Sequence, residues 1–183
     1  MRPSERERGV RGRRARVPRR PLPARARLIA LLGDTHLPRG ARRLPADCVR
    51  ILEACDLILH LGDFTTASVL DDLRARAPVA AVHGNVDDAS LRRSLPRRLM
   101  VEAEGLRIGL VHDPGSRPGR HERLRGWFPG CDVVAYGHTH LPELEENEGV
   151  WIVNPGSPTE RRRAAAHTMV VVDGATPELV ELR

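Results

Sequence analysis

The sequence contains no lysine, few aromatic residues and no long hydrophobic run. All 30 basic residues are arginine, and Phe, Trp and Tyr together make up 3% of the 183 residues. A folded core must therefore consist mainly of aliphatic side chains. A membrane-spanning helix needs about 18 or more consecutive apolar residues, and a secretory signal needs an apolar segment after its basic start. The sequence has neither pattern, so we expect a cytoplasmic protein with no membrane contact.

Cysteine is also rare in this sequence. Its three cysteines, Cys48, Cys55 and Cys131, form neither a C-x-x-C pair nor an even set. Disulfide frameworks and cysteine metal sites depend on such patterns. We therefore expect three buried or free thiols in a reducing compartment.

The positive charge is concentrated at the N-terminus. Residues 1–27 hold eleven arginines and two glutamates, whereas residues 28–183 hold nineteen arginines and twenty-two acidic residues. A segment rich in Arg and Pro without periodic apolar residues is typical of disorder. We predict a disordered arm over residues 1–26 and a single domain over residues 27–183. The arm would either bind nucleic acid or an anionic surface, or have no role, and we favour the second alternative.

Residues 27–36 form an apolar run that ends in Gly-Asp-Thr-His. Four to six consecutive apolar residues before a glycine predict a strand buried on both faces. Side chains two positions apart in an extended chain point to the same side. Asp34 and His36 would then leave the end of this strand together, as two potential metal ligands. Such a pair by itself is weak evidence for a metal.

The same pattern, an apolar run followed by ligand-type residues, recurs four times. The later motifs are Gly62-Asp63, Gly84-Asn85, His112 and Gly137-His138-Thr139-His140. Ligands of open α/β sheets bind outside the carboxyl ends of the strands. The repetition therefore predicts that one edge of a sheet gathers these side chains.

The hydrophobic periodicity predicts strands alternating with helices in the first half and mostly strands in the last third. We expect helices at residues 46–54, 66–76, 88–95 and 120–128. Strands are expected at 27–32, 57–61, 79–83, 98–103, 106–111, 132–135, 141–145, 150–153, 168–172 and 178–181. This order suggests a mostly parallel sheet packed against a second, more antiparallel sheet, with helices outside.

The ordered motifs, with the turn Asn154-Pro155-Gly156-Ser157, resemble those of the calcineurin-like metallophosphoesterase superfamily. The resemblance covers residue 27 to the C-terminus. It is closest to the small single-domain prokaryotic phosphodiesterases, a group that includes relatives of the retromer scaffold subunit. It implies a four-layer α/β/β/α sandwich of two mixed sheets flanked by helices, with a two-metal site at the strand ends.

The resemblance also implies a ligand set and a reaction. The first metal would be held by Asp34, His36 and His140, the second by Asn85, His112 and His138, and Asp63 would bridge them. Carboxylate, amide and imidazole donors suit divalent transition metals, with manganese first and iron, cobalt, nickel or zinc as alternatives. The implied activity is hydrolysis of small or nucleotide-like phosphodiesters through a metal-bridging hydroxide. Asp63, Asn85 and His138 would take part in catalysis through the metals.

Two positions depart from the pattern of the family. Val86 stands where broadly active members carry a histidine that acts on the leaving group, and a general acid of this kind contributes about 10²- to 10⁴-fold in rate. We therefore expect slow turnover and a preference for good leaving groups. Asp113 follows His112, where glycine is common in the family. Asp87, Asp113 or a backbone carbonyl would orient the ligand histidines.

Several other residues have a structural interpretation that we favour over a functional one. We expect His60, His83, His121 and His167 to be packed, hydrogen-bonded or solvated, Arg161–Arg163 to be a solvated surface, and Trp127, Phe128 and Trp151 to pack. For residues 154–157, a simple turn and a loop lining the metal site are equally compatible with the sequence.

Two functions besides hydrolysis are compatible with the sequence. A scaffold could keep the fold and use its surface to bind protein partners, but a scaffold has no need to retain seven ligands. A nucleic-acid-processing enzyme guided by the basic arm is the third possibility. Association into a homo-oligomer is compatible with each of these functions.

Overall fold

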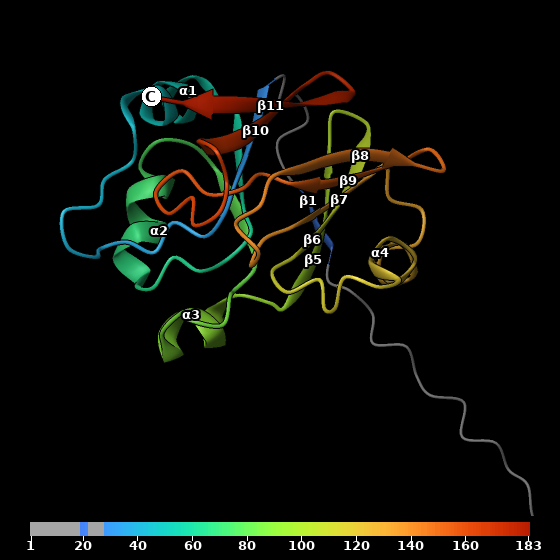
Figure 1. The fold of residues 1–183 in the computed structure, drawn as a ribbon, viewed down its shortest axis with the longest axis horizontal. Coiled ribbons are helices and arrows are strands. Elements are labelled where there is room, and N and C mark those ends of the chain that lie inside the picture. The colour runs from blue at the N-terminus through green and yellow to red at the C-terminus, as the bar shows by residue number, and fades with distance from the viewer. Residues whose placement is uncertain (1–18, 22–27) are drawn as a thin grey trace, which may run out of the picture.

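The computed structural model describes residues 19–21 and 28–183. These residues form two β-sheets that pack face to face, with helices α1 and α2 on one side and α4 on the opposite side (Figure 1). The helices span α1 Ala46–Ala54, α2 Ala67–Arg74, α3 Ala89–Ser94 and α4 Arg120–Trp127. The four-layer α/β/β/α arrangement is therefore confirmed.

Each sheet combines parallel and antiparallel strands. The first has the order β11 (Thr176–Leu182), β10 (His167–Asp173), β2 (Leu28–Leu32), β3 (Leu57–His60) and β4 (Val79–Ala81). The second has the order β1 (Arg19–Pro21), β5 (Arg98–Ala103), β6 (Leu106–Val111), β7 (Val133–Tyr136), β9 (Val150–Asn154) and β8 (Glu143–Asn147). The expectation of one mostly parallel and one more antiparallel sheet was wrong. Both sheets are mixed. In the first, β10 pairs antiparallel with β2 and β11. In the second, β6, β7 and β9 run parallel to one another.

The central core lies between the two sheets and is almost entirely aliphatic. Strand β2 shows how it forms, because Ile29 and Leu31 face this core while Ala30 and Leu32 face the helices. This alternation is the period-two pattern of a strand that is covered on both faces. The aliphatic core that the low aromatic content predicted is therefore confirmed.

Each outer layer has its own apolar cluster. On the first sheet, α1 contributes Cys48 and Leu52. On the second sheet, α4 and the residues after it contribute Leu124, Phe128 and Cys131. A Cβ atom at Gly109 would overlap the Phe128 ring, so close packing of α4 requires glycine at that position.

Every helix and strand expected from the sequence has a counterpart in the structure, within a few residues at its ends. One strand was not expected. Arg19–Pro21 forms β1, which pairs in parallel with β5 at the edge of the second sheet. The remainder of the predicted disordered arm, residues 1–18 and 22–26, lies outside the described residues. Within the described part of the chain, no helix has the length and apolar character needed to cross a membrane.

Candidate metal centre

Seven side chains of ligand type meet where strands of both sheets end. They are Asp34 and His36 after β2, Asp63 after β3, Asn85 after β4, His112 after β6, and His138 and His140 after β7. Within each sheet these strands run parallel, so their carboxyl ends lie together. Contacts of Asp63 with His36 and with His112 show that the two sets of strand ends meet. This is the crevice position where ligands of α/β sheets bind.

The first half of the cluster consists of Asp34, His36 and His140, all three of which are buried. Nε2 of His36 lies 3.2 Å from Nε2 of His140. Oδ1 of Asp34 lies 3.4 Å from Nε2 of His140 and 4.0 Å from Nε2 of His36. Three donor atoms from two strand ends thus face one point, and they could hold a metal ion.

The second half consists of Asn85, His112 and His138. Oδ1 of Asn85 lies 2.9 Å from Nε2 of His112 and 3.0 Å from Nδ1 of His138. The two ring nitrogens lie 3.3 Å apart. His112 is buried, whereas Asn85 and His138 are exposed, so this half is open to solvent.

Asp63 lies between the two halves. Its Oδ2 atom is 3.7 Å from Nε2 of His36 and 3.4 Å from Nε2 of His112. Its Oδ1 atom accepts a hydrogen bond from the Val86 backbone N–H at 3.0 Å. A Cβ atom at Gly84 would overlap this carboxylate, which explains why a glycine precedes Asn85.

The backbone at the site is left-handed rather than extended. Among the candidate ligands, positive φ angles occur at Asp34 (54°), His36 (46°), Asp63 (59°), His138 (70°) and His140 (59°). The expectation that Asp34 and His36 share a side because the chain stays extended was therefore wrong. They converge because both residues turn at the strand end. Such conformations are costly for residues other than glycine and concentrate at functional sites.

Backbone carbonyls orient two of the histidines. Nδ1 of His112 lies 2.8 Å from the Leu61 carbonyl oxygen, and Nδ1 of His140 lies 2.5 Å from the Glu160 carbonyl oxygen. A ring that donates from Nδ1 keeps its Nε2 lone pair for a metal. Of the acceptors expected from the sequence, the backbone carbonyl is the one seen at these two residues.

Asp87 and Asp113 accept hydrogen bonds from backbone N–H groups rather than from the ligand histidines. Asp87 is buried and receives the N–H groups of Asp63 at 3.1 Å and Gly84 at 2.7 Å. It thus joins the loops that follow β3 and β4. Asp113 is exposed, and its Oδ1 accepts from the Gly115 N–H at 2.8 Å within its own turn.

Burial sets the protonation of the site. It raises the pKa of Asp34 well above its usual value, with a further contribution from the nearby charge of Asp63. It lowers the pKa of His140 to about 4 and also lowers the pKa values of His36 and His112. At neutral pH these histidines are neutral, which is the form that binds metals.

The donor set fits divalent transition metals. Oδ1 of Asp34 is buried and has no hydrogen-bond partner among the described residues, and buried polar atoms of this kind need an explanation. Asp63 brings a second carboxylate close to it. A cation would satisfy the unpaired oxygen and relieve the repulsion between the two acids. Imidazole combined with carboxylate and amide oxygens suits Mn, Fe, Co, Ni or Zn.

The turn at residues 154–157 forms hydrogen bonds to the loops that carry the candidate ligands. The sequence did not decide between a simple turn and a loop that lines the site. Nδ2 of Asn154 donates to the Gly137 carbonyl at 3.2 Å and to Oγ1 of Thr139 at 2.9 Å. Oγ of Ser157 donates to the Asp34 carbonyl at 2.8 Å. These bonds fix the loop between His138 and His140 against the strand end that carries Asp34.

Sequence reasoning missed Glu160. Its carboxylate Oε2 lies 3.8 Å from Nε2 of His36 and 3.0 Å from Nη1 of Arg42. The signal in the sequence was only its position three residues after the Asn-Pro-Gly-Ser turn, which does not by itself identify a functional residue.

The residues expected to be structural mostly are so. His60 is fully buried, stacks on Phe64 and accepts the Gly62 N–H at 3.1 Å. Arg98 lies over the Trp127 ring at 3.6 Å. Nη1 of Arg161 donates to the Ala165 carbonyl at 2.8 Å, which closes its own turn.

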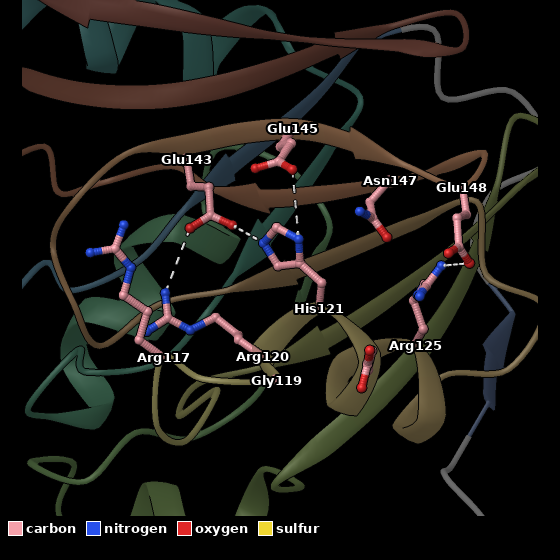
Figure 2. A pocket seen from close by; sticks show the side chains of 10 residues that line it. Arg117, Gly119, Arg120, His121, Arg125, Glu143, Glu145, Asn147 and Glu148 are labelled. Carbon is pink, nitrogen blue, oxygen red and sulfur yellow. Dashed lines mark hydrogen bonds and ion pairs between the residues drawn. The ribbon is translucent and has the colours of Figure 1, made fainter.

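A second cluster of ligand-type residues lies away from this centre, in a surface hollow of about 420 Å³ between α4 and β8 (Figure 2). Nε2 of His121 lies 2.8 Å from Oε1 of Glu143, and its Nδ1 lies 3.8 Å from Oε1 of Glu145. Glu143 also accepts the Tyr136 hydroxyl at 2.6 Å and lies 3.6 Å from Nη1 of Arg120. No motif in the sequence predicts that His121 contacts these glutamates.

Comparison with known proteins identifies the family. The family model of the calcineurin-like phosphoesterase superfamily domain matches residues 28–176. The chain belongs to this superfamily. A probable metallophosphoesterase of Methanothermobacter thermautotrophicus is 38% identical over 150 residues, which cover 80% of this chain and 87% of that relative. A second probable metallophosphoesterase, from Methanocaldococcus jannaschii, is 38% identical over 139 residues, covering 74% of this chain and 70% of that relative.

Two solved structures have the same fold. Vacuolar protein sorting 29 of Cryptosporidium parvum superposes with a TM-score of 0.73 at 24% identity, covering 86% of this chain and 92% of that one. An archaeal phosphodiesterase superposes with a TM-score of 0.68 at 22% identity, covering 85% and 99%. At these identities the two structures show the fold alone. The family and the ligand cluster together support a metal-dependent phosphoesterase.

Proposed function

We propose that this member of the calcineurin-like superfamily is a binuclear phosphodiesterase that acts on small or nucleotide-like phosphodiesters. The observation that carries the proposal is the position of Asp63, whose Oδ2 atom lies between His36 and His112. One carboxylate between two sets of donor atoms is an arrangement that a pair of ions can share. The archaeal phosphodiesterase with the same fold supports the choice of a diester.

Two divalent transition metals, with manganese first, would be held by the seven residues. Asp34, His36 and His140 would hold one, Asn85, His112 and His138 the other, and Asp63 both. When bound, such ions polarise the phosphoryl group and supply a water nucleophile at neutral pH. The chain contributes oriented neutral imidazoles and carboxylates that are not already paired with arginine.

The substrate would approach from the side of Asn85, Val86 and His138, the exposed part of the centre. Val86 is 43% exposed and has no group that can donate a proton to a leaving alkoxide. The chain therefore supplies no general acid at this position. We expect slow turnover of esters with poor leaving groups and faster turnover of aryl esters.

The test is hydrolysis of a chromogenic aryl phosphodiester and of the matching monoester by metal-stripped protein, with Mn, Co, Ni, Zn and Mg added back in turn. Diester hydrolysis should require a transition metal and fall more than about 100-fold in Asp63→Asn. Asp71→Asn makes the same chemical change on the exposed face of α2 and should leave the rate unchanged. A folded protein without activity in any metal would contradict the proposal and favour the scaffold function.

Replacing Val86 tests the missing acid directly. Val86→His should increase the rate on alkyl phosphodiesters by about tenfold or more, since general acids contribute about 10²- to 10⁴-fold when well placed. The rate on aryl diesters, whose leaving groups need no proton, should change little. Val86→Gln, which adds bulk without an acid, is the control. Equal rates for all three proteins on alkyl esters would show that this position does not limit catalysis.

A further inference from the structure

Glu160 lies close to both histidines of the first half of the centre. Its backbone carbonyl lies 2.5 Å from Nδ1 of His140, and its carboxylate Oε2 lies 3.8 Å from Nε2 of His36. Its own N–H donates to Oγ of Ser157 at 2.9 Å, which fixes the backbone beside Asp34. The carboxylate is therefore held next to the nitrogen of His36 that also faces Asp34 and Asp63.

The two halves of the centre differ in charge. The half that contains Asp34 has a carboxylate of its own and lies beside Glu160, whereas the half that contains Asn85 has only neutral ligands of its own. Both halves share Asp63. A divalent cation binds more strongly as carboxylates are added, and hard oxygen donors favour Mn²⁺ relative to Zn²⁺.

We propose that the Glu160 carboxylate lies beside the first metal position, which Asp34, His36 and His140 form, and that its negative charge makes this position the tighter of the two. The inference rests on the proposed binuclear centre. Donor atoms that share one ion lie roughly 3 to 4 Å apart, because each lies about 2.0–2.2 Å from the ion. Among the donor atoms of the described residues, Glu160 meets this spacing only with Nε2 of His36, at 3.8 Å, and is not one of the donor atoms that converge at this position, so it acts through its charge rather than as a direct ligand.

Arg42 provides the alternative explanation for Glu160. Its Nη1 atom lies 3.0 Å from Oε2 of Glu160, so the carboxylate could be simply half of a partly exposed ion pair between two loops. The two explanations differ in what removal of Arg42 should do. If the glutamate serves the metal, the loss of its competing partner leaves metal binding intact or strengthens it.

Calorimetric titration of metal-stripped protein with Mn²⁺ distinguishes them. Wild type should show two unequal positions. Glu160→Gln should weaken the tighter position about 10- to 100-fold and leave the other unchanged, with a smaller loss for Zn²⁺. Glu160→Asp, which keeps the charge on a shorter side chain, should recover part of the affinity. Arg42→Met should bind at least as tightly as wild type.

The outcomes separate this inference from the proposed function. Equal affinities in wild type and Glu160→Gln, with loss in Asp63→Asn, would overturn the role of Glu160 and leave the binuclear centre standing. A parallel loss in Glu160→Gln and Arg42→Met would assign Glu160 to the ion pair instead. Failure of wild type to bind any of the metals would refute the centre itself. Thermal melts of each variant verify that it is folded.

Discussion

The two clusters of ligand-type residues in this molecule contain similar groups but use them differently. At the strand ends, Oδ1 of Asp34 is buried and has no hydrogen-bond partner within the described part of the chain. In the surface hollow, Glu143 pairs with His121 and Arg120 (Figure 2). It also accepts a hydrogen bond from the Tyr136 hydroxyl. Residue type and proximity are similar in both places. The difference is that, among the residues that the structure describes, a buried donor at the strand ends has no partner, which is typical of a cation site. The donors in the hollow already pair with one another, which is typical of a surface ion-pair network.

Metal removal should separate the two clusters most strongly. Mn²⁺ at about 100 times its dissociation constant stabilises a protein by about 2.7 kcal/mol, which raises the melting temperature of a domain of this size by about 5 to 10 °C. We expect this shift in wild type and in His121→Ala, and its loss in Asp63→Asn. Thermal melts of chelator-treated protein with and without Mn²⁺ provide the measurement. A shift that persists in Asp63→Asn but is lost in His121→Ala would place the metal in the surface hollow instead of at the strand ends.

Hydrogen bonds that hold the ligand-bearing loops should affect metal affinity at the strand ends, whereas side chains beside the hollow should not. Asn154→Ala removes the hydrogen bonds to Gly137 and Thr139, so we expect a 10- to 100-fold loss of metal affinity, as is typical when the partners of ligand residues are removed. Asn147→Ala, which makes the same change on β8 beside the hollow, should leave metal affinity unchanged. Titration with Mn²⁺ compares them, and equal affinities for both variants would disprove the supporting role.

Acid should destabilise the metal-free protein between about pH 6.5 and 4. Burial lowers the pKa of His140 to about 4 and also lowers those of His36 and His112, whereas histidines of the unfolded chain titrate near 6.5. In this window the unfolded state binds more protons, so the free energy of unfolding falls as the pH falls. Asp34, with its raised pKa, acts in the opposite direction but is one group against three.

Urea unfolding of chelator-treated protein at several pH values measures this dependence. The slope of unfolding free energy against pH should be smaller in His140→Gln, which cannot take up the proton. A flat profile in wild type would show that the buried histidines are not held neutral by the fold.

The smallest effect is expected from the hollow itself. His121→Ala breaks ion pairs that are partly exposed, so stability should change by about 1 kcal/mol or less. Diester hydrolysis and the number of Zn²⁺ ions bound per chain should stay the same as in wild type. The loss of one bound Zn²⁺ in this variant would show that the surface cluster also holds a metal.

The sequence was most informative where one motif, an apolar run followed by ligand-type residues, repeats along the chain. Apolar runs that end in ligand-type residues located the strands and the seven side chains that the structure brings together, because the ends of parallel strands meet at one edge. It was uninformative about contacts between distant loops. Glu160 reaches His36 across 124 positions, and no local pattern encodes that approach.

The backbone conformation at the strand ends was also not predictable from the sequence. An apolar run predicts extended backbone, yet Asp34 and His36 adopt left-handed angles at its end. Asp and His adopt this region more often than most residues other than glycine, but their residue type alone does not predict it at the end of an apolar run. The pairing of Arg19–Pro21 with β5 was missed because a segment rich in Arg and Pro has no strand periodicity.

The placement of the three cysteines gives each outer layer of the sandwich its own reporter of local opening. Cys48 lies on the buried face of α1, Cys55 directly follows α1, Cys131 follows α4, and all three are buried. Burial raises the pKa of Cys48 to about 12, so its thiol is protonated as well as covered. Thiol-labelling reagents react with exposed thiolate. The labelling rates of single-cysteine variants would therefore measure how often each helical layer separates from its sheet, without any probe having to be introduced.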